Sequence, residues 1–98
     1  MDEKRGTGRT TKQIKEAPKN AVYVWVSGDA HYPRRLAREL GREDLEIVGP
    51  TWIENYRWRG VGSLNVVIDH AAYSFLTNRQ NIVLIEMLHY LSAYKKPE

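Results

Sequence analysis

The apolar run at residues 21–26, Ala-Val-Tyr-Val-Trp-Val, constrains the fold of this chain most strongly. A strand with one face in water alternates apolar and polar residues, but every position of this run is apolar. Such a run predicts a strand that is buried on both faces, as in a parallel sheet covered by helices. Two further segments that are mostly apolar, the short Leu-Glu-Ile-Val at residues 45–48 and Leu-Asn-Val-Val-Ile-Asp at residues 64–69, predict two more strands of the same sheet.

Helical patterns separate and follow the predicted strands. Thr10 or Thr11 is expected to cap a short helix, which Pro18 ends because proline cannot continue helical hydrogen bonding. A second helix is expected between the first two strands, with Pro33 near its first turn and Gly41 just past its end. This order of elements predicts an α/β layered fold with a mainly parallel sheet of about three strands flanked by helices.

A third and longer helix is predicted over residues 78–94, where apolar residues recur at helical spacing. Its apolar surface is wider than one stripe, since the helix contains Ile82, Val83, Leu84, Ile85, Met87, Leu88 and Leu91. We expect the part that a small sheet leaves uncovered to contact a partner or a second copy of the chain. The alternative is that the aromatic segment at residues 51–63 folds over it and completes a monomeric core.

The chain has 98 residues, which predicts one domain over residues 1–98, with residues 1–9 forming a mobile tail and a loop. No cysteine is present, so disulfides and thiolate metal sites are excluded. No apolar run is long enough to span a bilayer, and an intracellular location is expected. The net charge of +3 permits an anionic partner without requiring one.

The segment Gly6-Thr7-Gly8-Arg9-Thr10 matches the end of a phosphate-binding loop, whose full pattern is Gly-x-x-x-x-Gly-Lys-Ser/Thr. In such loops backbone N–H groups and the N-terminus of the next helix bind phosphate oxygens. Arg9 stands at the position of the lysine, and Thr10 at that of the magnesium ligand. The alternative is a glycine-rich tail that happens to precede a helix.

A second motif, Val66-Val67-Ile68-Asp69, is an apolar strand that ends in an aspartate. This is the form of the element whose carboxylate orients magnesium in nucleotide hydrolases. His70 and Ala71 follow it, where helicase-like ATPases have Glu-Ala. The alternative is a plain buried strand with a capping aspartate.

Over roughly residues 5–75 the two motifs resemble those of P-loop NTPases with a helicase-like core. The chain also resembles small uncharacterised bacteriophage proteins that carry a Gly-Thr-Gly-Arg-Thr-Thr loop and a later apolar-Asp-His element. These resemblances imply a reduced P-loop NTPase-like fold, a viral origin and a location in the host cytoplasm. They also imply ATP or another nucleotide, with magnesium, as the ligand.

The resemblance assigns roles to individual residues. The phosphate-binding residues it implies are Gly6, Thr7, Gly8, Arg9, Thr10 and Thr11. Magnesium would be held by Thr10 and Asp69. Efficient hydrolysis is not expected, because Arg9 and His70 replace the lysine and the catalytic glutamate.

Two further groups of residues suggest a nucleic acid or an acidic protein as partner. One is the set of arginines on and after the second helix: Arg34, Arg35, Arg38 and Arg42. The other combines aromatic rings that could stack on bases with arginines that could meet phosphates: Trp52, Tyr56, Arg57, Trp58 and Arg59. The alternatives are a solvated helix face and a loop whose tryptophans fill the core. Two alternative functions therefore remain open besides nucleotide binding. They are those of a non-catalytic viral interaction protein and of a nucleic-acid-binding accessory protein.

Overall fold

The computed structural model of the protein describes residues 8–59 and 64–94. Gly6, Thr7 and most of the expected mobile tail lie outside the described residues. In chain order the elements are α2 (Arg9–Glu16), β1 (Val22–Val24), α3 (His31–Glu39), β2 (Glu46–Val48), α4 (Thr51–Glu54), β3 (Val66–Ile68), the 3₁₀ helix η1 (Ala72–Phe75) and α5 (Asn78–Tyr94).

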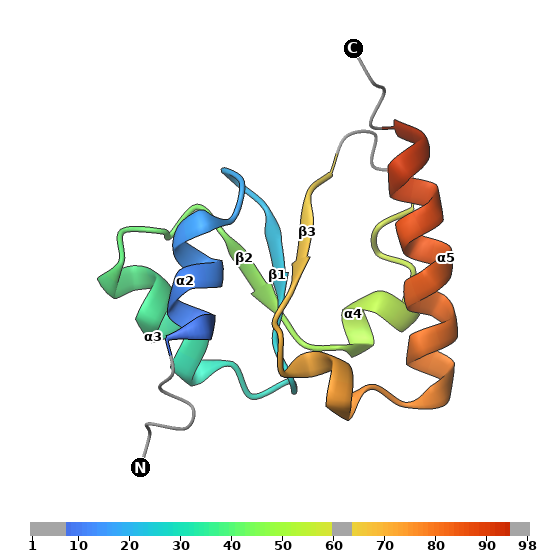
Figure 1. Ribbon diagram of the computed structural model, residues 1–98, viewed down its shortest axis with the longest axis horizontal. Helices are drawn as coiled ribbons and strands as arrows, with labels where there is room; N and C mark the ends of the chain where they lie inside the picture. Colours follow the sequence, from blue (N-terminus) through green and yellow to red (C-terminus); the bar gives the residue numbers. More distant parts are fainter. Residues whose placement is uncertain (1–7, 60–63, 95–98) are drawn as a thin grey trace.

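The three strands form one sheet in the order β2-β1-β3, and both strand pairs are parallel (Figure 1). In the central strand Val22 lies beside Glu46 on one side and Val66 on the other. The predicted α/β class and the parallel three-stranded sheet are thus confirmed. The strands are shorter than predicted: β1 ends at Val24, and although Trp25 still donates to the Val48 carbonyl oxygen, the chain then bends.

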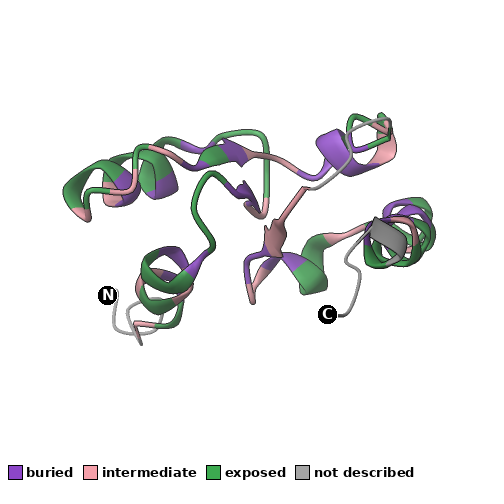
Figure 2. Ribbon diagram, turned by 90° about the horizontal axis from the view of Figure 1, so that it is seen from above, coloured by how far each residue is buried: buried purple, intermediate pink, exposed green. Residues whose placement is uncertain are grey.

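Helices cover both faces of the sheet, with α2 and α3 on one side and α4, η1 and α5 on the other (Figures 1 and 2). Consecutive residues of β1 point to opposite faces. Val22 and Val24 therefore pack with α4 and α5, whereas Tyr23 packs with α2 and α3. All three are buried, which confirms that β1 is covered on both faces.

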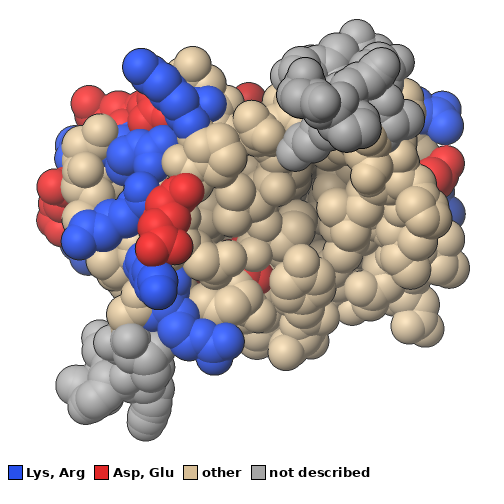
Figure 3. All heavy atoms as spheres, turned by 45° about the horizontal axis from the view of Figure 1, so that its top comes forward, with Lys and Arg blue, Asp and Glu red and all other residues tan. Residues whose placement is uncertain are grey.

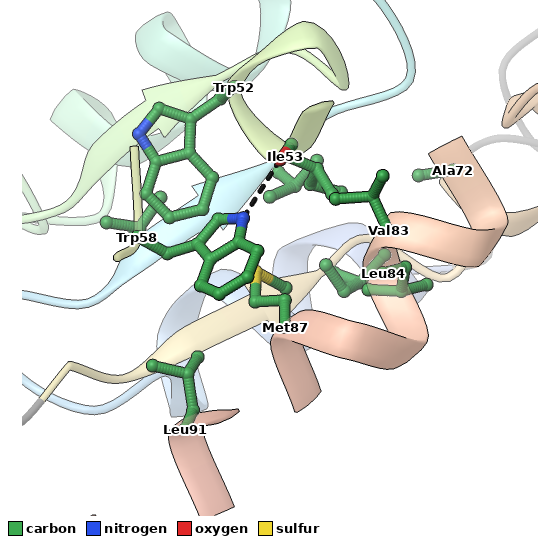
Figure 4. Close-up of a cluster of buried hydrophobic side chains, with 11 residues drawn as sticks. Trp52, Ile53, Trp58, Ala72, Val83, Leu84, Met87 and Leu91 are labelled. Carbon is green, nitrogen blue, oxygen red and sulfur yellow. Dashed lines mark hydrogen bonds between the residues drawn. The ribbon is translucent and has the colours of Figure 1, made fainter. Parts of the chain in front are cut away.

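The aromatic segment after β2 completes the core beneath α5. Trp58 is fully buried, and its indole Nε1 donates to the carbonyl oxygen of Ile53 at 2.9 Å (Figure 4). Trp52 is also buried in this cluster, together with Leu84 and Met87 of α5. The prediction that these tryptophans stack on bases is therefore wrong, because both rings are packed inside the protein.

Side chains hydrogen-bond to the two outer edges of the sheet. Arg34 donates to the Ile47 carbonyl oxygen on β2 at 3.2 Å. On β3 the amide of Gln13 donates to the Ile68 carbonyl oxygen at 3.0 Å and accepts from the His70 N–H at 2.7 Å. Gln13 thus pairs with the strand as a residue of a neighbouring strand would, and it ties α2 to the end of β3.

Arg42 ties the end of α2 to the loop before β2. Its Nη1 donates to the carbonyl oxygens of Ile14 at 2.9 Å and Lys15 at 3.0 Å. Nε and Nη2 of Arg42 each donate to a carboxylate oxygen of Asp44 at 3.0 Å. These hydrogen bonds hold the pKa of the Asp44 carboxyl group well below its usual range. The Arg42 side chain is only 17% exposed, so it does not share the surface of the α3 arginines.

Replacing Gly49 with alanine is expected to destabilise the protein by about 1–3 kcal/mol through overpacking. A Cβ atom at this position would lie 2.8 Å from the Ser27 carbonyl oxygen and 2.9 Å from the Gly28 Cα. These are backbone atoms, so the turn after β1 would have to move. Urea unfolding measures the change. Gly28→Ala is the matched control, since its Cβ meets nothing within 4 Å; an equal loss in both variants would contradict the explanation.

Candidate functional site

The candidate site lies where the N-terminus of α2 meets the C-terminal end of β3. Open parallel sheets place their ligands outside the carboxyl ends of the strands. Thr10 and Asp69 are 59 residues apart in sequence, and the Thr10 hydroxyl donates to Asp69 Oδ2 at 3.0 Å. The two motifs identified in the sequence therefore come into direct contact.

Asp69 is fully buried and accepts three hydrogen bonds. Oδ2 accepts from the Thr10 hydroxyl and from the Tyr23 phenol, and Oδ1 accepts from the Ala71 N–H at 2.9 Å. A buried carboxylate requires such donors, because it has lost its hydration. Its own N–H donates to the Val24 carbonyl oxygen at 2.9 Å, so the side chain is fixed directly to the end of the sheet.

Tyr23 is a site residue that the sequence analysis did not identify. Burial raises the pKa of its phenol, and the nearby Asp69 carboxylate raises that pKa further. The phenol therefore stays protonated and donates to the carboxylate. The sequence did contain a sign of this role, because Tyr23 places a hydroxyl group in the middle of a strand that was predicted to be buried on both faces. A buried hydroxyl group needs a hydrogen-bond partner.

His70, the residue after Asp69, also contacts the Thr10 hydroxyl and lies close to the Asp69 carboxylate. Its Nε2 lies 3.2 Å from the Thr10 hydroxyl oxygen and 3.9 Å from Asp69 Oδ1. Gln13, which the sequence analysis also missed, accepts the backbone N–H of His70. The polar cluster thus consists of Thr10, Gln13, Tyr23, Asp69 and His70.

The helix α2 starts after Gly8 and without a capping side chain. Gly8 precedes the helix with φ of +87°, a left-handed conformation that glycine adopts without steric cost. The prediction that Thr10 or Thr11 is the N-cap is wrong, because α2 already begins at Arg9 and the Thr10 hydroxyl bonds to Asp69 instead.

A surface hollow beside the cluster is lined by Arg9, Lys12, Gln13, Glu16 and His70. The first turn of a helix presents unpaired N–H groups and the positive end of the helix dipole. Arg9 is exposed at this end of α2, and Lys12 is exposed one turn further along. Glu16 adds a carboxylate to the hollow and lies 3.9 Å from the Lys12 ammonium group, so the part of the hollow that favours an anion is the end beside Arg9.

A magnesium ion at this position would rely on Thr10 and Asp69. A hydroxyl and a carboxylate are ligands of the kind that magnesium accepts, with water and phosphate oxygens completing its shell. Among residues 8–59 and 64–94 there is no group of three or more His, Cys, Asp or Glu side chains that could hold a metal ion.

The basic residues proposed for a nucleic acid lie apart from this cluster. Arg34, Arg35 and Arg38 are exposed on α3, and Figure 3 shows Lys and Arg gathered over the side of the molecule that carries α2 and α3. Arg59 is elsewhere: its guanidinium lies over the rings of Tyr56 and Trp58, and it pairs with Glu86 of α5 at 3.5 Å.

Comparison with known proteins identifies no relative. No protein-family model matches the chain, and no curated protein and no solved structure is detectably similar to it. In the part of the chain that the structure describes, no helix is long and apolar enough to cross a membrane.

Proposed function

We propose that this protein binds the phosphate groups of a nucleotide at the N-terminus of α2 and does not hydrolyse it efficiently. The observation that carries the proposal is the hydrogen bond between Thr10 and Asp69, which joins a glycine-preceded helix start to a buried carboxylate at the end of a parallel strand. Neither feature alone requires a ligand, but their contact matches the arrangement that phosphate-binding α/β proteins use.

Each residue of the site has a role in this proposal. Arg9 and the first N–H groups of α2 would bind phosphate oxygens. Thr10 and Asp69 would hold magnesium if a cation accompanies the phosphates. Arg9 has the charge of the usual lysine but a bulkier, forked head, and His70 replaces the catalytic glutamate, so turnover is expected to be negligible.

Thermal unfolding with ATP, GTP or pyrophosphate, each with and without magnesium, tests the proposal. A ligand at 100 times its dissociation constant stabilises the folded state by about 2.7 kcal/mol, which raises Tm by several degrees. Thr10→Val is expected to abolish the rise, since Thr10 donates to Asp69. Thr11→Val should preserve most of it, because Thr11 would bind phosphate through its backbone N–H, which valine keeps. The absence of any rise with millimolar ligands would refute the proposed function.

A second proposal, self-association through α5, is supported by the exposed apolar residues of that helix. Ile82, Ile85 and Leu88 are 67%, 58% and 46% exposed, and Phe75 of η1 is 65% exposed. Four other residues first considered for this surface, Val83, Leu84, Met87 and Leu91, are buried within the chain. The remaining interaction surface is therefore narrower than the sequence suggested.

Ile85→Lys is expected to weaken this self-association at least tenfold, because it places a charge in the centre of an apolar contact. Light scattering over a range of protein concentrations measures the change, and Lys15→Ala, at an exposed position of α2 on the other side of the sheet, is the control. A wild-type protein that remains monomeric at millimolar concentration would exclude this proposal without affecting the nucleotide site.

A further inference from the structure

We propose that His70 determines whether this site accepts a divalent cation. The imidazole lies beside the hydrogen-bonded pair of Thr10 and Asp69, with Nε2 3.2 Å from the Thr10 oxygen and 3.9 Å from Asp69 Oδ1, so a cation can bind both residues on this side only by displacing the ring. The assignment of the site as a phosphate site rests on the proposed function. The blocking role of His70 rests on the contacts of the cluster itself.

The hydrogen bonds define which atom donates. The Thr10 hydroxyl has a single proton, and it donates this proton to Asp69 Oδ2. The contact of 3.2 Å with His70 must therefore be an Nε2–H group that donates to a lone pair of the Thr10 oxygen. The same nitrogen lies 3.9 Å from Asp69 Oδ1, so it faces both oxygens that a cation would use.

A magnesium ion and the imidazole cannot share this space. Magnesium binds oxygen ligands at about 2.0–2.1 Å. An ion at that distance from the Thr10 oxygen, on the side that faces His70, would overlap the ring, whose Nε2 is only 3.2 Å from the same oxygen. The cation can reach the hydroxyl from this side only after the imidazole has left.

The backbone on both sides of the ring is held in place. The His70 N–H donates to Gln13 Oε1 at 2.7 Å, and Gln13 also binds the carbonyl oxygen of Ile68. On the other side, the Ala71 N–H donates to Asp69 Oδ1 at 2.9 Å. The Cα of His70 is thus fixed close to Thr10, and only side-chain rotation could move the ring away.

Shortening the side chain should open a route for an ion. The His70 side chain is 27% exposed and lines the surface hollow next to α2. It therefore lies between solvent and the Thr10–Asp69 pair. Truncation at this half-buried position should preserve the fold, which thermal unfolding would verify for each variant.

The test is a titration with Mn²⁺ alone, followed by electron paramagnetic resonance of the free ion. His70→Ala is expected to bind Mn²⁺ about tenfold more tightly than the wild type, because the ion no longer has to break the hydrogen bond between His70 and Thr10. Adding Thr10→Val to His70→Ala should abolish the gain. His70→Gln keeps a hydrogen-bond donor of similar reach and should remain close to the wild type.

Equal Mn²⁺ affinity in the wild type and His70→Ala, including undetectable binding by both, would overturn the inference. A gain that survives Thr10→Val would also overturn it, because the ion would then bind elsewhere. Since no nucleotide is present, this result is separate from the proposed function. Tighter Mn²⁺ binding without nucleotide-dependent stabilisation would support the role of His70 and refute nucleotide binding.

Discussion

Trp58→Ala is expected to lower the free energy of unfolding by about 3–5 kcal/mol, the largest effect of any single substitution considered for this protein. Trp58 is fully buried in the cluster that the aromatic segment forms with α5 (Figure 4). Its ring also packs against Tyr56 and Tyr90, each at a centroid distance of 5.3 Å. The loss is a large fraction of the stability of a domain of this size, which is commonly about 5–15 kcal/mol.

The measurement is urea unfolding followed by circular dichroism. Arg57→Ala, at the adjacent exposed position, is the control and should change the stability by no more than about 0.5 kcal/mol. Trp58→Phe should give an intermediate loss, because it restores part of the volume but removes the donor to the Ile53 carbonyl oxygen. A stability close to that of the wild type in Trp58→Ala would show that the aromatic segment does not form part of the core.

Asp69→Ala is expected to destabilise the protein by several kcal/mol, since a buried donor left without an acceptor costs about 1–3 kcal/mol. The phenol of Tyr23 and the hydroxyl of Thr10 would both lose their acceptor. In the described part of the chain every fully buried side-chain nitrogen or oxygen atom has a partner, so the substitution would introduce the first unpaired ones.

A double-mutant cycle separates the contribution of the Tyr23–Asp69 contact from general loss of packing. Tyr23→Phe removes the phenol oxygen alone, and in the Asp69→Ala background it should be nearly neutral or stabilising. A coupling energy of about 0.5–3 kcal/mol between the two positions is expected. Additive effects of the two substitutions would mean that the hydrogen bond does not hold the site together.

Local sequence patterns were sufficient to predict most of the secondary structure. The uninterrupted apolar run at residues 21–26 predicted a strand covered on both faces, and β1 is such a strand. The 3.6-residue repeat of residues 78–94 predicted α5 with the boundaries that the structure has. The two short elements α4 and η1 were missed, because helices of one turn contain no full period of a repeat.

The surroundings of individual side chains could not be predicted in the same way. Trp52 and Trp58 belong to the same segment as Arg57 and Arg59 and were compatible with a nucleic-acid surface, but contacts with the distant α5 bury both rings. Arg42 was grouped with the exposed arginines of α3, whereas its guanidinium binds the end of α2. Local sequence spacing does not record which segments of the chain meet.

For the candidate site, the sequence alone determined the residue types and the strand-end position of the aspartate. Thr10 follows a glycine at a helix start, and Asp69 ends an apolar strand. Only the tertiary structure decided that their side chains are in contact, because that contact depends on how α2 packs against the end of β3. The same packing placed His70, which the sequence had already set beside Asp69, against the Thr10 hydroxyl. It also brought in Gln13 and Tyr23, whose partners Ile68, His70 and Asp69 lie more than 40 residues away in the chain and could not be named from local spacing.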